Sequence, residues 1–173
     1  MQTFLQQLSH ISTLVFDVDG VLTNGDVFVA DDGNQFRQFN IKDGYALQLA
    51  VKCGYHVCAI SGAEAKATHI RLNRLGITHV YTGCKDKSGQ LEQYLEKIGV
   101  MPANVLFMGD DIPDLQVMQL AGLPVCPADA VAEIKAISKY ISPVNGGEGC
   151  VRDVIEKVMR VQGKWLSGDA YSW

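Results

Sequence analysis

The chain has 173 residues, of which 47% are hydrophobic, and its formal net charge at pH 7 is −4. This length suits one domain over residues 1–173, and the apolar content is too high for a disordered chain. The acidic balance argues against nucleic acid as a partner, because a polyanion favours a basic protein face. No apolar run approaches the roughly 18 residues of a membrane span, and the N-terminus lacks the features of a secretory signal. We therefore expect a cytoplasmic protein with neither nucleic acid nor membrane as a partner.

Short apolar runs alternate with amphipathic segments along the chain. The runs expected to form strands are 14–16, 55–60, 79–81, 105–108, 123–126 and 140–141. Several of them lack polar alternation, as in strands of a parallel sheet that are buried on both faces. The expected helices are 43–53, 64–75, 87–98, 113–121 and 151–161, with Asp43 as the N-cap of the first. This alternation predicts a doubly wound, three-layer α/β fold with a parallel central sheet.

One segment, about residues 26–39, interrupts this alternation. Its strand-like runs 26–30 and 35–39 are joined by Asp31-Asp32-Gly33-Asn34, which is a strong turn signal and predicts a β-hairpin. The runs are apolar for a protruding ribbon, and an isolated two-stranded hairpin is only marginally stable. We therefore expect the hairpin to pack on another subunit.

Four groups of polar residues each follow an expected strand, at the edge where open α/β sheets bind ligands. The first is FDVDGVLT, in which Asp17 and Asp19 alternate on an extended segment and so point the same way. Two such carboxylates repel each other, and a divalent cation bound to one of them relieves the repulsion. A lone D-x-D is more often a capped turn with surface acids, but the three further groups outweigh that interpretation.

The second and third groups offer donors for an anion. Ser61-Gly62 precedes a helix, where a hydroxyl and free backbone N–H groups can bind a phosphate, although an ordinary N-cap has the same residues. Lys87 begins a helix, where a cation opposes the helix dipole. This unfavourable position indicates that Lys87 has a task other than that of a surface lysine.

The fourth group is GDDIPDLQVM, which contains Asp110, Asp111 and Asp114. One of these carboxylates can complete a magnesium site with Asp17, and a second can orient Lys87. Magnesium prefers six oxygen ligands and keeps several waters, so two carboxylates and one carbonyl suffice. The alternative is that these acids only favour the start of a helix through its dipole.

In order and spacing, DVDGVLT, ISG, Lys87 and GDDIPD resemble the four motifs of the haloacid dehalogenase superfamily of phosphatases. The gaps between the motifs leave no room for the large cap domain of many relatives, so the chain is similar to the capless branch. The 26–39 hairpin and the tail sequence GGEGCVRDVIEKV add to the likeness. The resemblance covers about residues 9–162 and implies a Rossmann-like fold and Mg²⁺-dependent phosphatase activity.

The resemblance also implies roles for individual residues. Asp17 would be the nucleophile, and Asp19 the general acid and base. Mg²⁺ would be bound by Asp17, the main-chain carbonyl of Asp19, and Asp110. The residues expected to bind the phosphate or the rest of the substrate are Ser61, Gly62, Thr23, Lys87 and Arg71.

Two further acids are expected to support these residues, Asp114 by positioning Lys87 and Asp111 from just outside the ligands of the ion. A capless enzyme must complete its site elsewhere, and the resemblance implies a homotetramer whose hairpins meet at the centre. The C-terminal tail, about residues 145–173, then looks able to close over a site as a mobile lid. The alternative for its glycine-rich part is an ordinary loop before a terminal helix.

The substrate implied by the resemblance is a small phosphorylated sugar acid, 3-deoxy-D-manno-octulosonate 8-phosphate, which is hydrolysed in lipopolysaccharide precursor synthesis. Relatives often carry Arg after the Ser/Thr-Gly pair, whereas this chain has Ala63 and Glu64, so a nonulosonate 9-phosphate is the alternative substrate. Two non-enzymatic classes fit less well. A phospho-acceptor signalling domain would not need the general acid at Asp19, and a regulatory domain of a sugar-nucleotide synthetase would lack the nucleophile Asp17.

Overall fold

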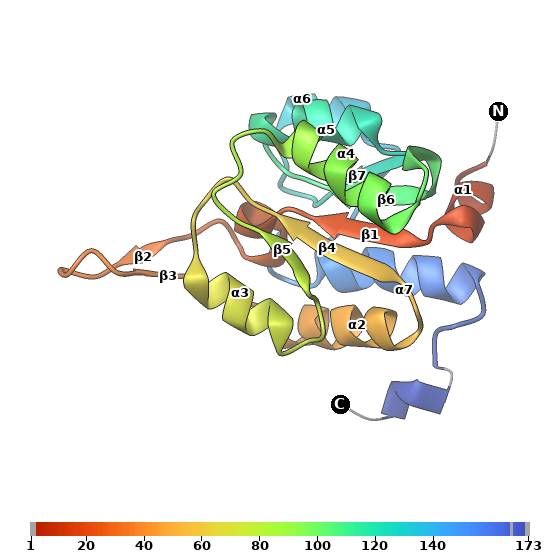
Figure 1. The fold of residues 1–173 in the computed structure, drawn as a ribbon, viewed down its shortest axis with the longest axis horizontal. Coiled ribbons are helices and arrows are strands. Elements are labelled where there is room, and N and C mark those ends of the chain that lie inside the picture. The colour runs from red at the N-terminus through yellow and green to blue at the C-terminus, as the bar shows by residue number, and fades with distance from the viewer. Residues whose placement is uncertain (1–2, 167, 172–173) are drawn as a thin grey trace.

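A six-stranded sheet forms the centre of the computed structural model, which describes residues 3–166 and 168–171 (Figure 1). Its strands lie in the order β5-β4-β1-β6-β7-β8, and all neighbours pair in parallel. The strands are β1 (Thr13–Phe16), β4 (His56–Ile60), β5 (His79–Tyr81), β6 (Val105–Met108), β7 (Leu123–Cys126) and β8 (Tyr140–Ile141). The six predicted strands are thus confirmed to within one residue at each end.

Helices cover both faces of the sheet (Figure 1). One face carries α1 (Phe4–His10), α2 (Ile41–Lys52), α3 (Lys66–Asn73) and α7 (Cys150–Val161), and the other carries α4 (Lys87–Ile98), α5 (Leu115–Leu120) and α6 (Ala132–Ile137). In β1, Leu14 and Phe16 join the core on the first face and Val15 joins the core on the second. This burial on both sides explains the absence of polar alternation. The doubly wound, three-layer prediction is confirmed, and no helix of the described residues is long and apolar enough to span a membrane.

The strand order reverses beside β1. The chain first builds outward from β1 through β4 to β5, and then returns to the other side of β1 to add β6, β7 and β8. The carboxyl ends of β1 and β6 therefore lie next to each other where the chain connections diverge. In open α/β sheets this is the position of the ligand-binding crevice.

The N-cap prediction for α2 is wrong by one turn. Asn40 caps this helix, because its side-chain oxygen accepts hydrogen bonds from the N–H groups of Lys42 (2.8 Å) and Asp43 (3.3 Å). Asp43 instead turns inward and accepts a hydrogen bond of 2.7 Å from the N–H of Arg152, in the first turn of α7. Gly149, which precedes α7, has no side chain for this purpose. Asp43 therefore caps a helix far along the chain rather than its own.

Several short elements depart from the expected helices. The helices α1 and α6 were not predicted; α1 has a capping box between Thr3 and Gln6 but buries only Leu8. The helix expected at 64–75 is shorter in the structure, and that expected at 113–121 is divided into a 3₁₀ turn and α5. The remaining short helical elements are η1 (Val18–Leu22), η2 (Pro102–Asn104), η3 (Ile112–Asp114) and η4 (Gly168–Tyr171).

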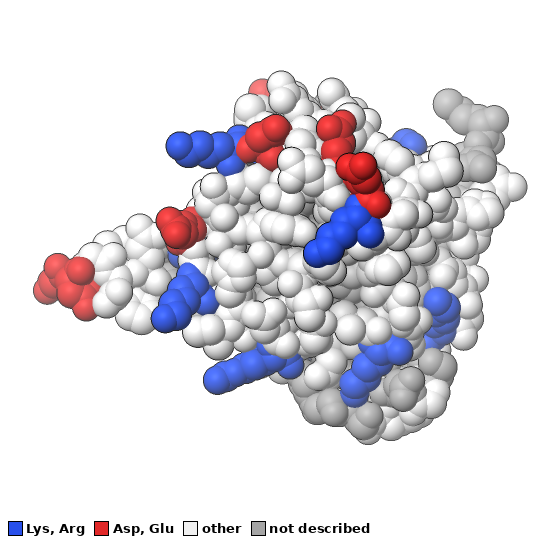
Figure 2. All heavy atoms as spheres, viewed as in Figure 1, with Lys and Arg blue, Asp and Glu red and all other residues white. Residues whose placement is uncertain are grey.

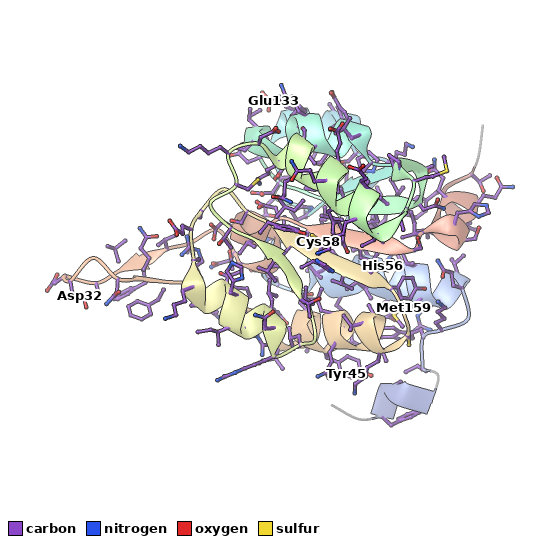
Figure 3. All side chains as sticks on the ribbon, in the orientation of Figure 1. Asp32, Tyr45, His56, Cys58, Glu133 and Met159 are labelled. Carbon is purple, nitrogen blue, oxygen red and sulfur yellow. The ribbon has the colours of Figure 1, made fainter. Side chains whose placement is uncertain are left out.

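The predicted hairpin is present and extends away from the body of the domain (Figure 1). Its antiparallel strands β2 (Phe28–Val29) and β3 (Gln35–Phe36) are shorter than expected. Asp32 lies at its tip (Figure 3), where Figure 2 also shows a group of acidic side chains. The strands are short because no other element of the described chain covers them, so only the turn and a few cross-strand contacts hold them together.

The glycine-rich loop before α7 is packed against the domain. The Gly146 N–H donates to Asp129 (2.9 Å), and the Gly147 N–H donates to the carbonyl of Val21 (2.9 Å). A Cβ atom on Gly146 would lie only 1.8 Å from the carbonyl oxygen of Gly20. In this structure the glycine-rich part is thus a packed loop before α7, as in the alternative interpretation, and the lid stays a prediction.

The tail beyond α7 folds back onto α2. The rings of Tyr45 and Trp165 meet edge to face at 6.4 Å, and the Arg152 guanidinium lies over both rings. Tyr45, labelled in Figure 3, also donates a hydrogen bond to the carbonyl of Ala170. Trp165 thus fixes the start of the tail, whereas Trp173 lies outside the described residues.

Asp43, which caps α7 from α2, makes the free energy of unfolding depend on pH in a predictable direction. Burial raises its pKa from 3.8 to about 6, against the opposing effect of the N–H groups of Arg152 and Gly149. Between these pH values the folded chain binds a proton that the unfolded chain has released, so stability falls as pH rises through this window. We expect the free energy of unfolding of the wild type to fall by about 2 to 3 kcal/mol relative to Asp43→Asn between pH 4 and pH 7.

Urea titrations of both proteins across this range measure the difference. The asparagine keeps an oxygen acceptor for the Arg152 N–H but does not titrate, and the contributions of all other acids cancel in the comparison. Parallel pH profiles of the two proteins would show that Asp43 is ionised in the folded chain as readily as in the unfolded one.

Candidate active site

Four segments bring predicted residues together at the carboxyl edge of the sheet. Asp17 follows β1 directly and Ser61 follows β4 directly, while Lys87 begins α4 and Asp110 lies two residues beyond β6. These four residues belong to the wall of one cavity of about 320 Å³. The complete lining is Asp17, Asp19, Gly20, Gly25, Ser61, Gly62, Ala63, Lys87, Asp110, Asp111, Pro113 and Asp114. Residues that are far apart in the sequence therefore form one site at the expected place.

Lys87 connects two of the acids. Its ammonium donates hydrogen bonds to Asp17 Oδ1 (2.9 Å) and to Asp114 Oδ1 (2.7 Å). Its side chain is only 8% exposed, so these charge-assisted bonds are formed away from bulk water. The other oxygen of Asp114 accepts the N–H of Asp110 at 3.2 Å. Asp114 therefore holds both Lys87 and the loop after β6, as predicted for a positioning residue.

The acids outnumber the cation in this buried space. Ligand oxygens of Asp17, Asp110 and Asp114 all lie within 4.8 Å of one another. Burial, with added repulsion from Asp114, raises the pKa of Asp17 to about 7, although Lys87 acts in the opposite direction. Burial and the neighbouring acids also raise the pKa of Asp110 to about 8. Burial disfavours the charge on Lys87, but Asp17 and Asp114 outweigh it and raise its pKa.

This charge imbalance fits a divalent cation. One ammonium does not compensate three carboxylates, and a metal ion beside them would favour their ionised forms. The donor set is made of hard oxygen atoms only, which suits Mg²⁺. Both oxygens of Asp114 already accept hydrogen bonds, one from Lys87 and one from the Asp110 N–H, whereas Lys87 binds only one oxygen of Asp17. Asp17 and Asp110 are therefore the carboxylates with oxygens available to such an ion. Asp19, whose main-chain carbonyl is the third expected ligand, belongs to the η1 turn directly after Asp17.

That turn, η1, brings the first motif close to Asp110. Gly20 has a φ of +87°, and a Cβ atom there would lie 2.0 Å from Asp110 Oδ2. Only glycine permits both this conformation and this approach. The Thr23 hydroxyl donates to the carbonyl of Val18 (3.2 Å) and accepts the N–H of Gly20 (3.4 Å), and so closes the turn around Asp19.

The remaining cavity residues match an anion site in part. The Ser61 hydroxyl accepts the N–H of Ala63 at 3.2 Å, as an ordinary cap would, but Ser61 and Gly62 both line the cavity. Asp111 also lines the cavity, yet its carboxylate accepts the N–H of Ile112 at 2.8 Å and begins the η3 turn. Asp111 thus has a local structural role beside the acids.

Two predicted binding residues lie elsewhere. Thr23 is fully buried behind the turn, and its hydroxyl is used within the backbone, so it supports Asp19 rather than binding substrate. Arg71 is not among the residues that line the cavity. Its Nη2 atom lies beside Gly44, where a Cβ atom added to that glycine would be only 2.5 Å away from it. The missing side chain at Gly44 leaves room for this guanidinium against α2. The placement does not support Arg71 as a substrate-binding residue in the single chain.

The sequence analysis missed one residue of the site, Arg37. This residue follows β3 in the hairpin, and its Nε donates to Asp19 Oδ1 at 2.5 Å while Nη2 donates to Oδ2 at 3.3 Å. Its side chain is 9% exposed. No spacing rule connects a hairpin arginine to a strand-end acid 18 residues earlier, because the path of the intervening chain decides their contact.

Comparisons with known proteins agree with this geometry. Residues 62–155 match the haloacid dehalogenase-like hydrolase family. The 3-deoxy-D-manno-octulosonate 8-phosphate phosphatase of Escherichia coli strain K12 is 36% identical over 160 residues, which are 92% of this chain and 85% of that protein.

Solved structures give the same result. The crystal structure of the phosphatase of that name from Yersinia pestis has a TM-score of 0.91 and 35% identity, covering 95% of this chain and 88% of that one. The corresponding enzyme from Moraxella catarrhalis, in complex with a magnesium ion, a phosphate ion and a KDO molecule, has a TM-score of 0.89 and 31% identity, with coverage of 92% and 91%. The chain thus belongs to the haloacid dehalogenase-like hydrolase family.

Proposed function

We propose that this chain is a Mg²⁺-dependent phosphatase that hydrolyses 3-deoxy-D-manno-octulosonate 8-phosphate through an aspartyl-phosphate on Asp17. The observation that carries the proposal is the position of Asp17 at the tip of β1, 2.9 Å from the Lys87 ammonium and beside Asp110. A carboxylate held in this way is a fixed nucleophile next to positive charge that can bind a phosphate. The magnesium-bound and phosphate-bound relative supports the choice of ion and reaction.

The proposed reaction has two steps. An oxygen of Asp17 forms a bond to phosphorus while the bond from phosphorus to the sugar oxygen breaks, and Asp19 gives its proton to that oxygen. The oxygen of a water molecule then forms a bond to phosphorus while the bond from phosphorus to the Asp17 oxygen breaks. The water proton passes to Asp19, inorganic phosphate leaves, and the Asp17 carboxylate is regenerated. Ser61, the Gly62 N–H and Lys87 would bind the equatorial phosphate oxygens, on which charge is spread in the transition state. Their position in the wall of one cavity supports this role. Asp17, Asp110 and the Asp19 carbonyl would hold Mg²⁺, which would supply positive charge that shields the phosphate from its anionic nucleophile.

The proposed substrate is taken from the related phosphatases, and comparing the hydrolysis of three phosphate esters tests it. We expect kcat/KM for 3-deoxy-D-manno-octulosonate 8-phosphate to exceed that for a nonulosonate 9-phosphate and for glucose 6-phosphate by at least about tenfold, because contacts to the sugar acid are realised only with the right chain length. Phosphate release measured with Mg²⁺ present gives the three values. Equal values for all three esters, or a preference for the hexose phosphate, would contradict the sugar-acid assignment.

The nucleophile is tested by Asp17→Asn. We expect kcat to fall by at least about a thousandfold, because an amide does not form the acyl-phosphate. The fold should persist, since the amide replaces a buried acid that neighbouring acids repel. Phosphate release and thermal unfolding without Mg²⁺ measure the two effects. A variant that keeps a substantial part of its turnover would exclude Asp17 as the nucleophile.

The metal site is tested by a pair of neighbouring substitutions. Asp110→Asn should raise the dissociation constant for Mg²⁺ at least about tenfold, because it removes one of two charged ligands. Asp111→Asn is the matched control, since the Asp111 carboxylate caps the η3 turn; it should change the constant less than about threefold. Isothermal titration of Mg²⁺ measures both. Similar Mg²⁺ affinity in wild type and Asp110→Asn would place the ion elsewhere.

The proposal includes a homotetramer held by the hairpins. Phe28, Val29 and Phe36 are 71%, 60% and 56% exposed on a ribbon that no element of the described chain covers. Contiguous exposed apolar side chains of this kind mark interaction surfaces, and adding further hairpins would provide the cover that short strands need. A cytoplasmic location completes the proposal and suits the five free cysteines.

The hairpin interface is tested by substituting both phenylalanines with serine. Light scattering of the wild type should give the mass of four 18.9 kDa chains, and Phe28→Ser/Phe36→Ser should give a smaller species because the apolar contact is lost. The double substitution leaves the core of the domain untouched, so its circular dichroism should match the wild type. A monomeric wild type at micromolar concentration would contradict the proposed assembly.

A further inference from the structure

The ion pair between Arg37 and Asp19 leaves most of the guanidinium unused. Two of its five N–H groups bind Asp19, and within the described residues Asp19 is its only hydrogen-bond partner. A part-buried arginine with free donors in fork geometry is suited to bind a carboxylate side-on. Arg37 therefore has the capacity to bind a second anion, either together with Asp19 or in place of it.

Arg37 also faces a second, larger cavity. This cavity has a volume of about 720 Å³ and lies between the hairpin and the first turns of α3. Its lining includes Gln35, Phe36, Arg37, Glu64, Lys66 and Thr68. Thr68 is 1% exposed, and its hydroxyl has no hydrogen-bond partner in the described part of the chain. A buried polar group without a partner beside a cavity indicates a place for a polar ligand.

The two cavities adjoin. Residues 61–63 line the first and residues 64–68 line the second, so the walls are continuous along the chain. Asp19 belongs to the first cavity and Arg37 to the second, and their ion pair lies at the boundary. A molecule whose phosphate is bound at Asp17 can thus extend past this pair into the larger space.

The charges assign the two ends of such a molecule to different cavities. The first cavity is lined by five carboxylates and one ammonium, so a second anionic group on the substrate is repelled from it. The second offers the guanidinium of Arg37 and the ammonium of Lys66 against the single carboxylate of Glu64. A phosphate ester that also carries a carboxylate would place that carboxylate in the second cavity.

We propose that Arg37 recognises the substrate carboxylate in the second cavity and gives up its bonds to Asp19 when it does so. The proposal rests on the proposed function, because it takes a sugar-acid phosphate as the substrate. The exchange would release the oxygens of Asp19 toward the leaving oxygen of the ester only when a carboxylate is present. Arg37 is then a specificity-determining residue, and the ion pair selects phosphate esters that carry a second anion.

Arg37→Met tests the proposal with two substrates. The variant should lower kcat/KM for 3-deoxy-D-manno-octulosonate 8-phosphate at least about tenfold, as expected for one lost charge-assisted contact. For phenyl phosphate, which has no carboxylate, kcat/KM should carry only the effect of the lost Asp19 ion pair, and the loss for the sugar-acid ester should exceed it at least about tenfold. The preference of the enzyme for the sugar-acid ester should therefore fall at least about tenfold.

Two further variants separate recognition from general damage. Arg37→Lys should recover part of the preference, because a point charge still attracts a carboxylate although it loses the fork geometry, and a folding defect would not be repaired in this way. Arg160→Met is the matched control; Arg160 is an exposed residue of α7 that pairs with Glu156 and should leave both substrates unaffected.

The outcomes distinguish this inference from the function on which it rests. An unchanged preference in Arg37→Met would overturn the inference alone, and so would an equal loss on both substrates, since the latter means that Arg37 only positions Asp19. A wild type that hydrolyses phenyl phosphate but not the sugar-acid ester would overturn the proposed function and the inference together. Loss of preference that the lysine variant partly restores would support the inference.

Discussion

The repulsion among buried carboxylates at one edge of the sheet is the constraint on which the site depends. Carboxylate oxygens of Asp17, Asp110 and Asp114 lie within 4.8 Å of one another, and among the described residues Lys87 is the one ammonium that pairs with them. Such an arrangement costs stability unless further positive charge is present. The same unfavourable energy makes the site suitable for a divalent cation and a phosphate, because both binding events relieve it. The buried carboxylates thus lower the stability of the unliganded domain at this edge. Binding of a metal ion and a phosphate relieves the repulsion, and this relief contributes to their affinity.

The fold maintains this arrangement through tight backbone contacts near the site. The strand order reverses beside β1, so Asp17 and the loop after β6 are adjacent. Gly20 then allows the first turn to approach Asp110, and the packed loop at Gly146 lies against the carbonyl of Gly20 in the same turn. Asp43 caps α7 across the interface between two helices, and so holds that loop at its far end. The position of the nucleophile Asp17 consequently depends on segments of the chain that lie outside the four sequence motifs.

The sequence predicted the elements and site residues that depend on local patterns. It did not predict the contacts that depend on packing between distant parts of the chain. The strands of the central sheet were found to within one residue because the apolar runs of a buried parallel sheet can be recognised without knowing their partners. Asp17, Lys87 and Asp110 were brought together correctly, since each follows a strand and the strand ends share one edge. Asp43 was misplaced for the opposite reason, because the start of a distant helix takes up its side chain. Substrate binding by Arg71 stays a prediction. Arg37 was missed because its contact depends on how the hairpin leaves the domain.

The central claim is that Asp17 carries the phosphoryl group during turnover, and acid quenching tests it most directly. The enzyme is mixed with substrate and Mg²⁺, quenched within the first turnover, digested and analysed by peptide mass spectrometry. The account predicts a transient phosphoryl adduct on the peptide that contains Asp17, which disappears as phosphate is released. A first turnover that releases phosphate with no adduct at any time point, or with an adduct on another residue, would contradict it.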